Sequence, residues 1–514
     1  MNGAHALLRT LVAGGVDTCF TNPGTSEMHF VAALDDVPEM RAVLTLFEGV
    51  ATGAADGYGR MSGRPAATLL HLGPGLGNGL ANLHNARRAR TPLVNIVGDH
   101  ATYHRPLDAP LASDIESVAR NVSGWIRDCR LAQDVGRDAS EAIVAALEGR
   151  VATLILTADA SWSDGAEPGA HAARHLQQPL PGAEIDIAAK ALRTGEPAAL
   201  LLGGQIREPA LRAAARVAER TGAKLLAETF PARLERGGGL PAVERLGYLA
   251  EFATAQLQGL RHLVLVDARV PVSFFAYPGK PSELVPDGCE VHQLVPQGDD
   301  PAPALEHLAD ALGAAATGDA LPAPARPDRP TGALTPETIA HAIGALLPEG
   351  SIVSDEANTA GLFVAGATTG APRHDWLTLT GGAIGQGLPV ATGAAVACPH
   401  RKVLALEADG SAMYTLQSLW TQAREGLDVT TVIFNNRSYA ILNLELSRVG
   451  ARTDGNAADL FDLSHPPLDF VALARGMGVD GTRAETAEEF TVALERALAE
   501  AGPHLIDAIL PSRL

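Results

Sequence analysis

The sequence predicts an α/β protein made of three domains, each built on a doubly wound parallel sheet. Short apolar runs alternate with amphipathic stretches along the chain, as in successive β-α units. At 514 residues the chain is long enough for about three domains of ~150 residues each. Two stretches rich in Pro, Gly and Ala, residues 164–182 and 313–332, have neither helical nor strand periodicity and are typical of linkers.

These linkers divide the chain into predicted domains at residues 1–165, 183–312 and 333–514. Each domain contains apolar runs of strand length that are followed by helix-like segments. The expected strands lie at residues 16–20, 42–46, 66–72 and 92–97, then 198–204 and 262–267, then 351–355, 403–408 and 430–436. Strands that alternate with helices pair in parallel, which favours doubly wound sheets in all three domains.

Two of these strands end in polar residues that could act together. Asp409 follows the run 403–408 and begins Asp-Gly-Ser, and Asn435-Asn436 ends the run 430–436. One βαβ unit would bring both strand ends to the same edge of the sheet. A carboxylate and an amide oxygen there suit Mg²⁺ bound to a diphosphate. Alternatively, Asp409 caps the following helix and the amides belong to a polar turn.

A second segment lies far away in the first predicted domain. Glu48 follows the apolar run 42–47 and precedes a Gly- and Ala-rich stretch that ends in Gly-Tyr-Gly-Arg at residue 60. The two segments resemble the two signatures of the thiamine-diphosphate-dependent superfamily of decarboxylases and acetolactate synthases. The usual G-D-G…N-N motif has Ala408 in place of its first glycine here. The resemblance covers nearly the whole chain and implies a pyrimidine-binding, a central and a diphosphate-binding domain, in that order.

The resemblance also implies which residues hold the cofactor and its metal. Asp409, Asn436 and the backbone carbonyl of Ser438 would bind Mg²⁺. The turn at Pro23 and Gly24 would support the pyrimidine end of thiamine diphosphate. The residues expected around the diphosphate are Asn358, Thr359, Gly410, Ser411, Tyr414 and Tyr439.

Two further segments would activate and bend the cofactor. Glu48 would share a proton with a pyrimidine nitrogen and so help to remove the proton on the thiazolium C2; alternatively, it only meets the dipole of its helix. In residues 380–394, Ile384 would separate the two rings and the carbonyl of Gly382 would accept from the amino group. Without the resemblance, that segment would be a Gly-kinked core helix.

Further residues are expected to form the substrate pocket. His71, in a loop that resembles that of benzoylformate decarboxylase, would transfer a proton or hold the substrate carboxylate; alternatively, it bonds a loop carbonyl. We expect Thr25, Phe275, Ile441 and Glu445 to line the pocket.

At three positions the residue differs from the one found in acetolactate synthases or in benzoylformate decarboxylase. Glu445 stands where acetolactate synthases carry a tryptophan, and Asp99 stands where they carry an active-site glutamine. Phe275 replaces the second catalytic histidine of benzoylformate decarboxylase. A charged pocket edge disfavours a second apolar oxo acid, and Phe275 disfavours rapid protonation.

These features predict an enzyme that decarboxylates a 2-oxo acid and transfers the enamine to an aldehyde or oxo-acid acceptor, as acetolactate synthase does. The first alternative is simple non-oxidative decarboxylation of the benzoylformate decarboxylase type. The second, from another class, is a non-catalytic paralogue that binds the cofactor or a regulatory partner. Some relatives bind FAD, but residues 185–310 carry no distinctive signal for it.

Composition and charge limit the partners. The chain has 40 basic and 59 acidic residues, a net charge of −19, which disfavours nucleic acid and anionic membranes. The N-terminus lacks the order of a signal peptide, and no apolar run reaches ~18 residues without Gly or a charge. We therefore expect a cytoplasmic protein. The resemblance implies a homodimer as the minimal active unit and favours a homotetramer.

Overall fold

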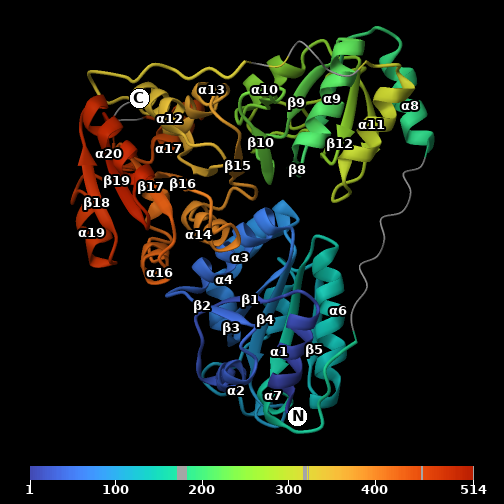
Figure 1. The fold of residues 1–514 in the computed structure, drawn as a ribbon, viewed down its shortest axis with the longest axis vertical. Helices are drawn as coiled ribbons and strands as arrows, with labels where there is room; N and C mark the ends of the chain where they lie inside the picture. The colour runs from blue at the N-terminus through green and yellow to red at the C-terminus, as the bar shows by residue number, and fades with distance from the viewer. Residues whose placement is uncertain (171–181, 316–320, 322, 453–454, 513–514) are drawn as a thin grey trace.

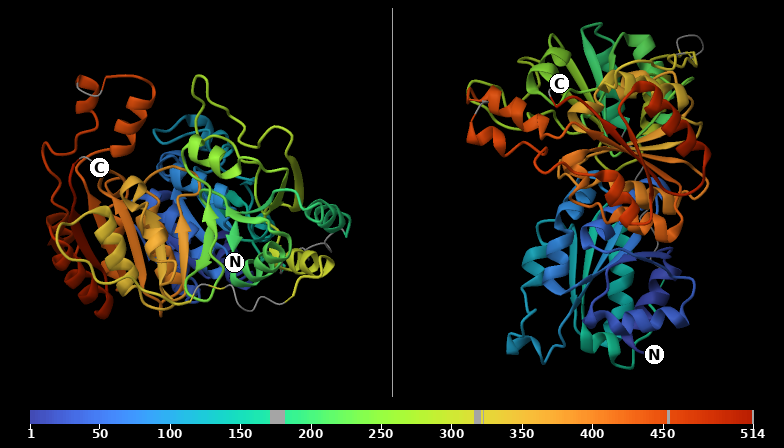
Figure 2. Two further views of the ribbon diagram at one scale, coloured as in Figure 1. Left: turned by 90° about the horizontal axis from the view of Figure 1, so that it is seen from above. Right: turned by 90° about the vertical axis from the view of Figure 1, so that its left-hand side faces the viewer.

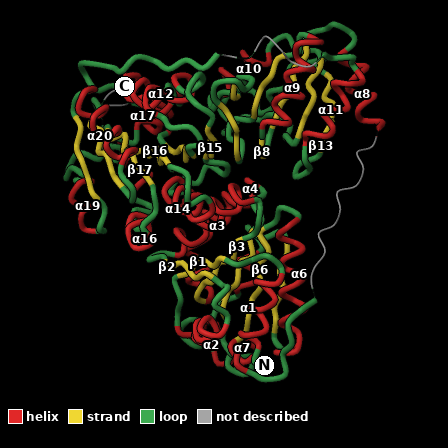
Figure 3. Tube along the Cα trace, viewed as in Figure 1, coloured by secondary structure: helices red, strands yellow, loops and turns green. Residues whose placement is uncertain are grey.

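The computed structural model describes residues 1–170, 182–315, 321, 323–452 and 455–512, and it contains three sheets (Figure 1). The predicted linker 164–182 falls mostly outside these residues, and so do residues 316–320 and 322 of the predicted linker 313–332. The fold class predicted from the sequence is confirmed, because all three sheets are built mainly of parallel strands with helices on their faces (Figure 3).

The first sheet has six parallel strands in the order β2-β1-β3-β4-β6-β5. Its strands are β1 Thr18–Thr21, β2 Arg41–Leu44, β3 Ala66–His71, β4 Leu93–Asp99, β5 Trp125–Cys129 and β6 Val151–Thr157. Its helices are α1 Gly3–Ala13, α2 Met28–Ala33, α3 Glu48–Ser62, α4 Leu72–Ala89, α5 Ile115–Ala119, α6 Val135–Leu147 and α7 Ala158–Trp162. The strands β3, β4 and β6 are buried almost throughout, as expected for a parallel sheet covered on both faces.

The second sheet is parallel, in the order β11-β9-β7-β12-β13. Its strands are β7 Ala198–Leu202, β9 Lys224–Ala227, β11 Glu244–Arg245, β12 His262–Val266 and β13 Glu290–Val295. Its helices are α8 Gly182–Leu192, α9 Glu208–Thr221, α10 Ala250–Leu257 and α11 Pro301–Ala311. A long loop, residues 267–289, connects β12 to β13 at the edge of the sheet.

The third sheet has eight strands in the order β18-β19-β17-β16-β14-β15-β10-β8. Six of them follow residue 333: β14 Ile352–Glu356, β15 His374–Thr378, β16 Val403–Ala408, β17 Val429–Asn435, β18 Asp480–Ala484 and β19 His504–Ile509. The helices of this part are α12 Pro336–Leu346, α13 Val364–Ala367, α14 Gly387–Ala397, α15 Asp409–Ala412, α16 Ser418–Glu425, α17 Ala440–Arg448, α18 Asn456–Asp459, α19 Phe470–Gly476 and α20 Ala487–Ala499.

The two remaining strands of this sheet were not expected there. β8 Gln205–Ile206 and β10 Arg233–Arg236 come from the predicted central domain, and β10 pairs antiparallel with β15. Their apolar side chains, Ile206 and Leu234, lie in one core with Trp376 of β15. Pairing with β10 satisfies the edge of β15, which would otherwise expose unpaired backbone groups. The third sheet is therefore mixed rather than purely parallel.

The first domain is joined to the third through α3 and α14, whose backbones touch (Figures 1 and 2). A Cβ at Gly57 would collide with the carbonyl of Val390, so this contact requires glycine. Nearby, Arg60 is fully buried, pairs with Asp56 and donates to the carbonyl of Thr378 at 2.8 Å. These contacts hold the first domain against the third.

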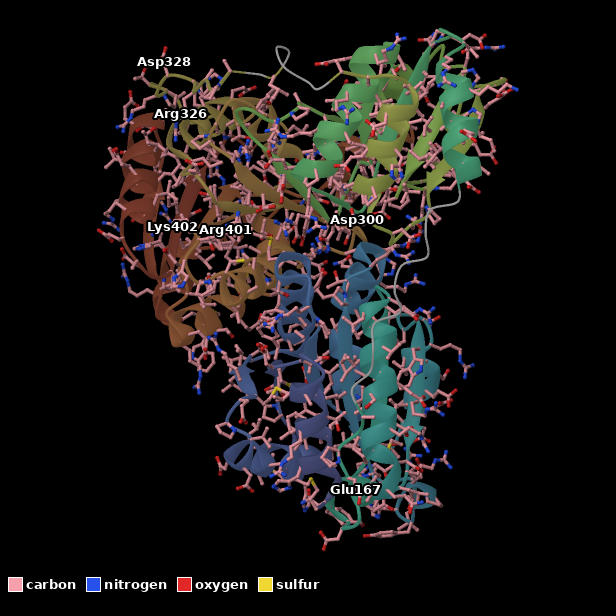
Figure 4. All side chains as sticks on the ribbon, turned by 45° about the vertical axis from the view of Figure 1, so that its right-hand side comes forward. Glu167, Asp300, Arg326, Asp328, Arg401 and Lys402 are labelled. Atoms are coloured by element: carbon pink, nitrogen blue, oxygen red, sulfur yellow. The ribbon has the colours of Figure 1, made fainter. Side chains whose placement is uncertain are left out.

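The two ends of the third sheet differ in character. At the amino ends, Arg401 pairs with Asp375 at 2.6 Å and Lys402 with Asp428 at 2.7 Å (Figure 4). The carboxyl ends instead surround a cavity, described below. Among the described residues, no helix combines the length and the apolar character that a membrane crossing needs.

Candidate active site

A cavity lies at the carboxyl ends of β14, β16 and β17, the usual ligand position in an open α/β sheet. The structure brings ten of the predicted site residues together in its wall. They are Asn358, Thr359, Ile384, Asp409, Gly410, Ser411, Asn436, Ser438, Tyr439 and Ile441. The remaining wall residues come from the same three strand ends and from the start of α17.

Asp409 is the buried carboxylate of this cavity, with only 2% of its surface exposed. Its oxygens accept one backbone N–H each, from Gly410 at 2.7 Å and from Arg437 at 2.6 Å. Burial raises the pKa of Asp409 to about 6, although these N–H groups oppose the shift. A carboxylate has about four acceptor positions, so Asp409 can still bind a cation.

The cavity wall is shaped by local backbone contacts. Asn358 has a left-handed backbone with φ of 51°, which asparagine tolerates better than most residues. Its amide donates to the Ser411 hydroxyl at 3.1 Å and so ties β14 to the segment after β16. The Tyr439 ring packs directly against Gly410, where any Cβ would overlap the ring.

Ile384 is held by contacts on both sides of it. The Asn85 side chain of α4 donates to the Ala383 carbonyl at 2.8 Å and accepts from its N–H at 3.2 Å. The Asn82 side chain donates to the Gly385 carbonyl at 3.1 Å, and the Thr415 hydroxyl does the same at 3.0 Å. The first domain therefore positions the loop that presents Ile384 to the cavity.

Two buried glutamates lie beneath this loop, and sequence reasoning missed both. Glu356, at the end of β14, accepts the N–H of Gly385 at 2.6 Å and that of Gly387. Its neighbour Glu407, in β16, is fully buried, and neither of its carboxyl oxygens has a hydrogen-bond donor among the described residues. Burial raises the pKa of Glu356 to about 7, and burial beside Glu356 raises that of Glu407 well above its usual range.

A second cluster forms around Glu48 in the first domain. Glu48 begins α3 directly after Phe47, and only 7% of its surface is exposed. Its carboxylate accepts from the Asn78 side chain at 3.0 Å. Gly75 of α4 lies between the carboxylate of Glu48 and the side chain of His71, so these two predicted catalytic residues are neighbours.

His71 is paired with a carboxylate that sequence reasoning missed. Its Nδ1 lies 2.9 Å from the Glu27 carboxylate and 3.0 Å from the Ser26 hydroxyl. Glu27 is 3% exposed and also accepts the Gly24 N–H at 2.8 Å, which anchors the turn that follows Pro23. A carboxylate on one ring nitrogen fixes the orientation of the imidazole and leaves Nε2 for a ligand.

Comparison with known proteins shows which family carries these two clusters. Residues 1–118 match the model of the N-terminal thiamine pyrophosphate binding domain, and residues 361–508 match that of the C-terminal one. The chain is 62% identical to the "Putative acetolactate synthase large subunit IlvX" of Mycobacterium tuberculosis, over 100% of this chain and 99% of that protein. The chain belongs to the thiamine pyrophosphate enzyme family.

Other relatives agree with this assignment. A benzoylformate decarboxylase of Pseudomonas aeruginosa is 31% identical over 96% of both chains. The solved 4-hydroxybenzoylformate decarboxylase of Rhodococcus jostii is 26% identical, covers 100% of both chains and superposes with a TM-score of 0.85. The family resemblance predicted from the sequence is thus confirmed, and this is a thiamine-diphosphate-dependent enzyme.

The cavity residues of this thiamine pyrophosphate enzyme fit the cofactor's metal and diphosphate. Asp409 offers carboxylate oxygens and Asn436 an amide oxygen, which are the hard ligands that Mg²⁺ prefers. A buried carboxylate is stabilised by a cation that compensates its charge. Asn358 and Ser411 supply polar groups beside them for phosphate oxygens.

Several predicted residues are not in the cavity wall. The Phe274 ring covers Gly382, and Tyr414 is 53% exposed beside Gly385. Thr25 and Phe275 are exposed away from this wall. Pro23, Gly24, Glu48 and His71 belong to the cluster in the first domain.

Glu445, which we expect at the edge of the substrate pocket, is bound by neighbouring side chains. Its carboxylate accepts from the Tyr277 hydroxyl and pairs with Arg448 at 2.9 Å. Arg448 also pairs with Glu251 at 2.9 Å. The Glu445 charge is therefore compensated, and its side chain ties α17 to the central loop instead of lining the cavity.

Proposed function

We propose that this enzyme decarboxylates a 2-oxo acid and transfers the remaining fragment to an aldehyde or oxo-acid acceptor, as an acetolactate synthase does. The observation that carries the proposal is the pair of clusters: an oxygen-ligand cavity at Asp409 and Asn436, and the buried Glu48 beside His71. Thiamine diphosphate, when bound, supplies the electron sink that a 2-oxo acid needs to lose CO₂.

In this proposal, each cluster has its own task. Asp409, Asn436 and the Ser438 carbonyl hold Mg²⁺, and Asn358 and Ser411 hold the diphosphate. Glu48, kept in place by Asn78, exchanges a proton with the pyrimidine ring. His71, oriented by Glu27, binds the substrate carboxylate or delivers a proton to the acceptor oxygen during bond formation.

The compensated charge of Glu445 supports transfer to an acceptor. The sequence alone places an acidic group where a second apolar substrate would have to fit. In the structure, Tyr277 and Arg448 bind that group and leave the Ile441 side of α17 facing the cavity. The relative with 62% identity is also named for acetolactate synthesis.

Simple decarboxylation to a free aldehyde is the second candidate. The His71–Glu27 pair is suited to proton delivery, and the Rhodococcus relative is named for such a reaction. Product analysis separates the two. With pyruvate, with and without an added aldehyde, we expect a ligated hydroxyketone or acetohydroxy acid. Release of free acetaldehyde alone would contradict transfer, and the same assay with benzoylformate tests the aromatic substrate class.

We further propose that a homodimer is the active unit and that dimers associate as tetramers. The described cavity wall contains only residues between 357 and 441, whereas Glu48 and His71 lie in the first domain. Large apolar side chains are exposed next to the cavity, among them Leu362 at 70% and Phe363 at 47%. A second copy would cover them and bring its Glu48 to the cofactor.

A further inference from the structure

Three metal-ligating side chains meet on the central sheet, at the amino ends of β12 and β13. They are His262, Glu290 and His292. The cavity of the proposed catalytic site lies at the carboxyl ends of strands in the third sheet. This cluster instead lies at the amino ends of strands in the second sheet. No part of the proposed reaction uses it.

The register of the two strands explains why the side chains converge. His262 is the direct partner of Glu290 in the parallel ladder of β12 and β13. His292 lies two residues after Glu290, and alternate residues of a strand share one face of the sheet. All three side chains therefore project from the same face at the edge of the sheet.

The distances match those of a zinc coordination sphere. His262 Nδ1 lies 3.2 Å from His292 Nε2 and 3.6 Å from the Glu290 carboxylate, and His292 Nε2 lies 3.8 Å from that carboxylate. Ligand atoms at the usual 2.0–2.1 Å from a tetrahedral zinc lie about 3.4 Å from one another. The three groups could thus bind one ion with small side-chain movements.

A fourth side chain supplies an outer contact. Glu196, just before β7, lies 3.2 Å from Nε2 of His262, the ring nitrogen that points away from the cluster. Histidines that bind metals commonly donate their second N–H to such a carboxylate, which fixes the tautomer and strengthens the ligand. This contact leaves Nδ1 of His262 as the ligand atom.

We propose that His262, His292 and Glu290 form a binding site for a zinc-type divalent cation, with Glu196 positioning His262 and water in the fourth position. Within the described ranges, this is the only group of three or more His, Cys, Asp or Glu side chains whose ligand atoms all lie within 4.8 Å. Two imidazoles and one carboxylate favour Zn²⁺ over Mg²⁺, which prefers oxygen ligands alone.

The cluster also has a defined place in the sheet, at the start of the edge strand β13. The ion would fasten the start of the edge strand β13, where the loop 267–289 ends, to the start of β12. That loop carries Phe274 and Tyr277, which contact the third domain at Gly382 and Glu445.

Calorimetric titration with Zn²⁺ tests the proposal directly. The full chain, treated with a chelator and then saturated with Mg²⁺, should bind one Zn²⁺ per chain at this site. His292→Ala should weaken that binding by about 100-fold or more, and Glu196→Gln by roughly 10- to 100-fold. Zn²⁺ should also raise the melting temperature of the parent but not that of His292→Ala.

His104→Ala is the matched control, because His104 also packs against a second histidine, with ring centroids of His100 and His104 5.2 Å apart, but belongs to no such three-ligand group. It should bind Zn²⁺ as the parent does. Thiamine diphosphate binding verifies that each variant is folded. Equal Zn²⁺ affinity in the parent and in folded His292→Ala, or no stoichiometric binding to the parent, would overturn the proposal.

Discussion

At the scale of single residues, the buried carboxyl groups differ in how many hydrogen bonds they accept. Glu356 accepts two or more backbone N–H groups and can carry a negative charge, whereas Glu407 beside it has no donor among the described residues. An unpaired charge in the interior costs several kcal/mol. Burial without a hydrogen-bond donor therefore favours the protonated form of Glu407.

This assignment predicts a change in the pH dependence of stability. The pKa of Glu407 is raised in the folded state, so its stabilising effect is complete below the unfolded value near 4.5 and is lost as pH rises through the folded value. Glu407→Gln cannot ionise and should lose less stability between pH 6 and 9, by up to ~1.4 kcal/mol per pH unit. Urea unfolding at several pH values measures this difference. Glu337→Gln, an exposed control, should follow the parent, and an unchanged slope in Glu407→Gln would contradict a protonated Glu407.

The His71–Glu27 pair gives a second prediction at this scale. Glu27→Gln removes the carboxylate that orients the imidazole but keeps its size, so we expect kcat to fall by roughly 100-fold, the lower end of a general acid–base contribution. Cofactor affinity should stay within about threefold, because glutamine keeps a side-chain oxygen that can accept the Gly24 N–H. Steady-state kinetics with pyruvate and fluorescence titration with thiamine diphosphate test both. A variant that loses cofactor binding instead would assign Glu27 a structural role in the Pro23–Gly24 turn.

At the scale of elements, the loop 380–386 depends on contacts from three separate parts of the chain. α4 supplies Asn82 and Asn85, β14 supplies Glu356, and the segment after α15 supplies Thr415. The strand runs and their polar ends were predictable from local patterns, and ten predicted residues do meet in one cavity. The side-chain contacts to this loop were not predictable, because their partners lie 29 to 303 residues away in the sequence and no local pattern marks them.

Large sequence separation also explains why strands β8 and β10 of the third sheet and the role of Glu27 were not predicted. β10 pairs with β15 across more than 130 residues, which periodicity cannot reveal. Glu27 follows a Pro-Gly turn, where an acidic residue is unremarkable until His71 is placed against it. The roles of Glu445 and Phe275 were predicted from a resemblance. In the structure, Glu445 bonds Tyr277 and Arg448, and Phe275 packs against Phe274.

The loop contacts predict a specific loss in Asn85→Ala. Both of its bonds to Ala383 disappear, so Ile384 is no longer held and the affinity for thiamine diphosphate should fall by about 10-fold, the equivalent of ~1.4 kcal/mol. Equilibrium titration with the cofactor in saturating Mg²⁺ measures the change. Asn95→Ala removes a buried amide of β4 that bonds Thr68 and Thr153, far from the loop. If Asn95→Ala lowered the affinity for thiamine diphosphate as much, the effect of Asn85→Ala would be one of general destabilisation.

At the scale of the whole molecule, we propose that the two clusters are half-sites that a second copy would complete. A symmetric dimer would pair the Glu48 cluster of each chain with the Asp409 cavity of its partner. Two inactive variants should therefore complement each other. A mixture of Glu48→Gln and Asp409→Ala chains, unfolded and refolded together, should regain about a quarter of the parental activity, because half of the dimers are mixed and each has one intact site. Each variant refolded alone is the control, and a mixture without activity would contradict a shared site.

The central claim is that Glu48 activates thiamine diphosphate held by the Asp409 cavity, and proton exchange on the bound cofactor tests it without knowledge of the substrate. Exchange of the C2 proton for deuterium, followed by NMR after rapid quenching, should be at least 100-fold faster on the parent enzyme than on free cofactor. Glu48→Gln should bind the cofactor with similar affinity and exchange it more than 10-fold more slowly than the parent. Equal exchange rates in the parent and in cofactor-loaded Glu48→Gln would contradict the account.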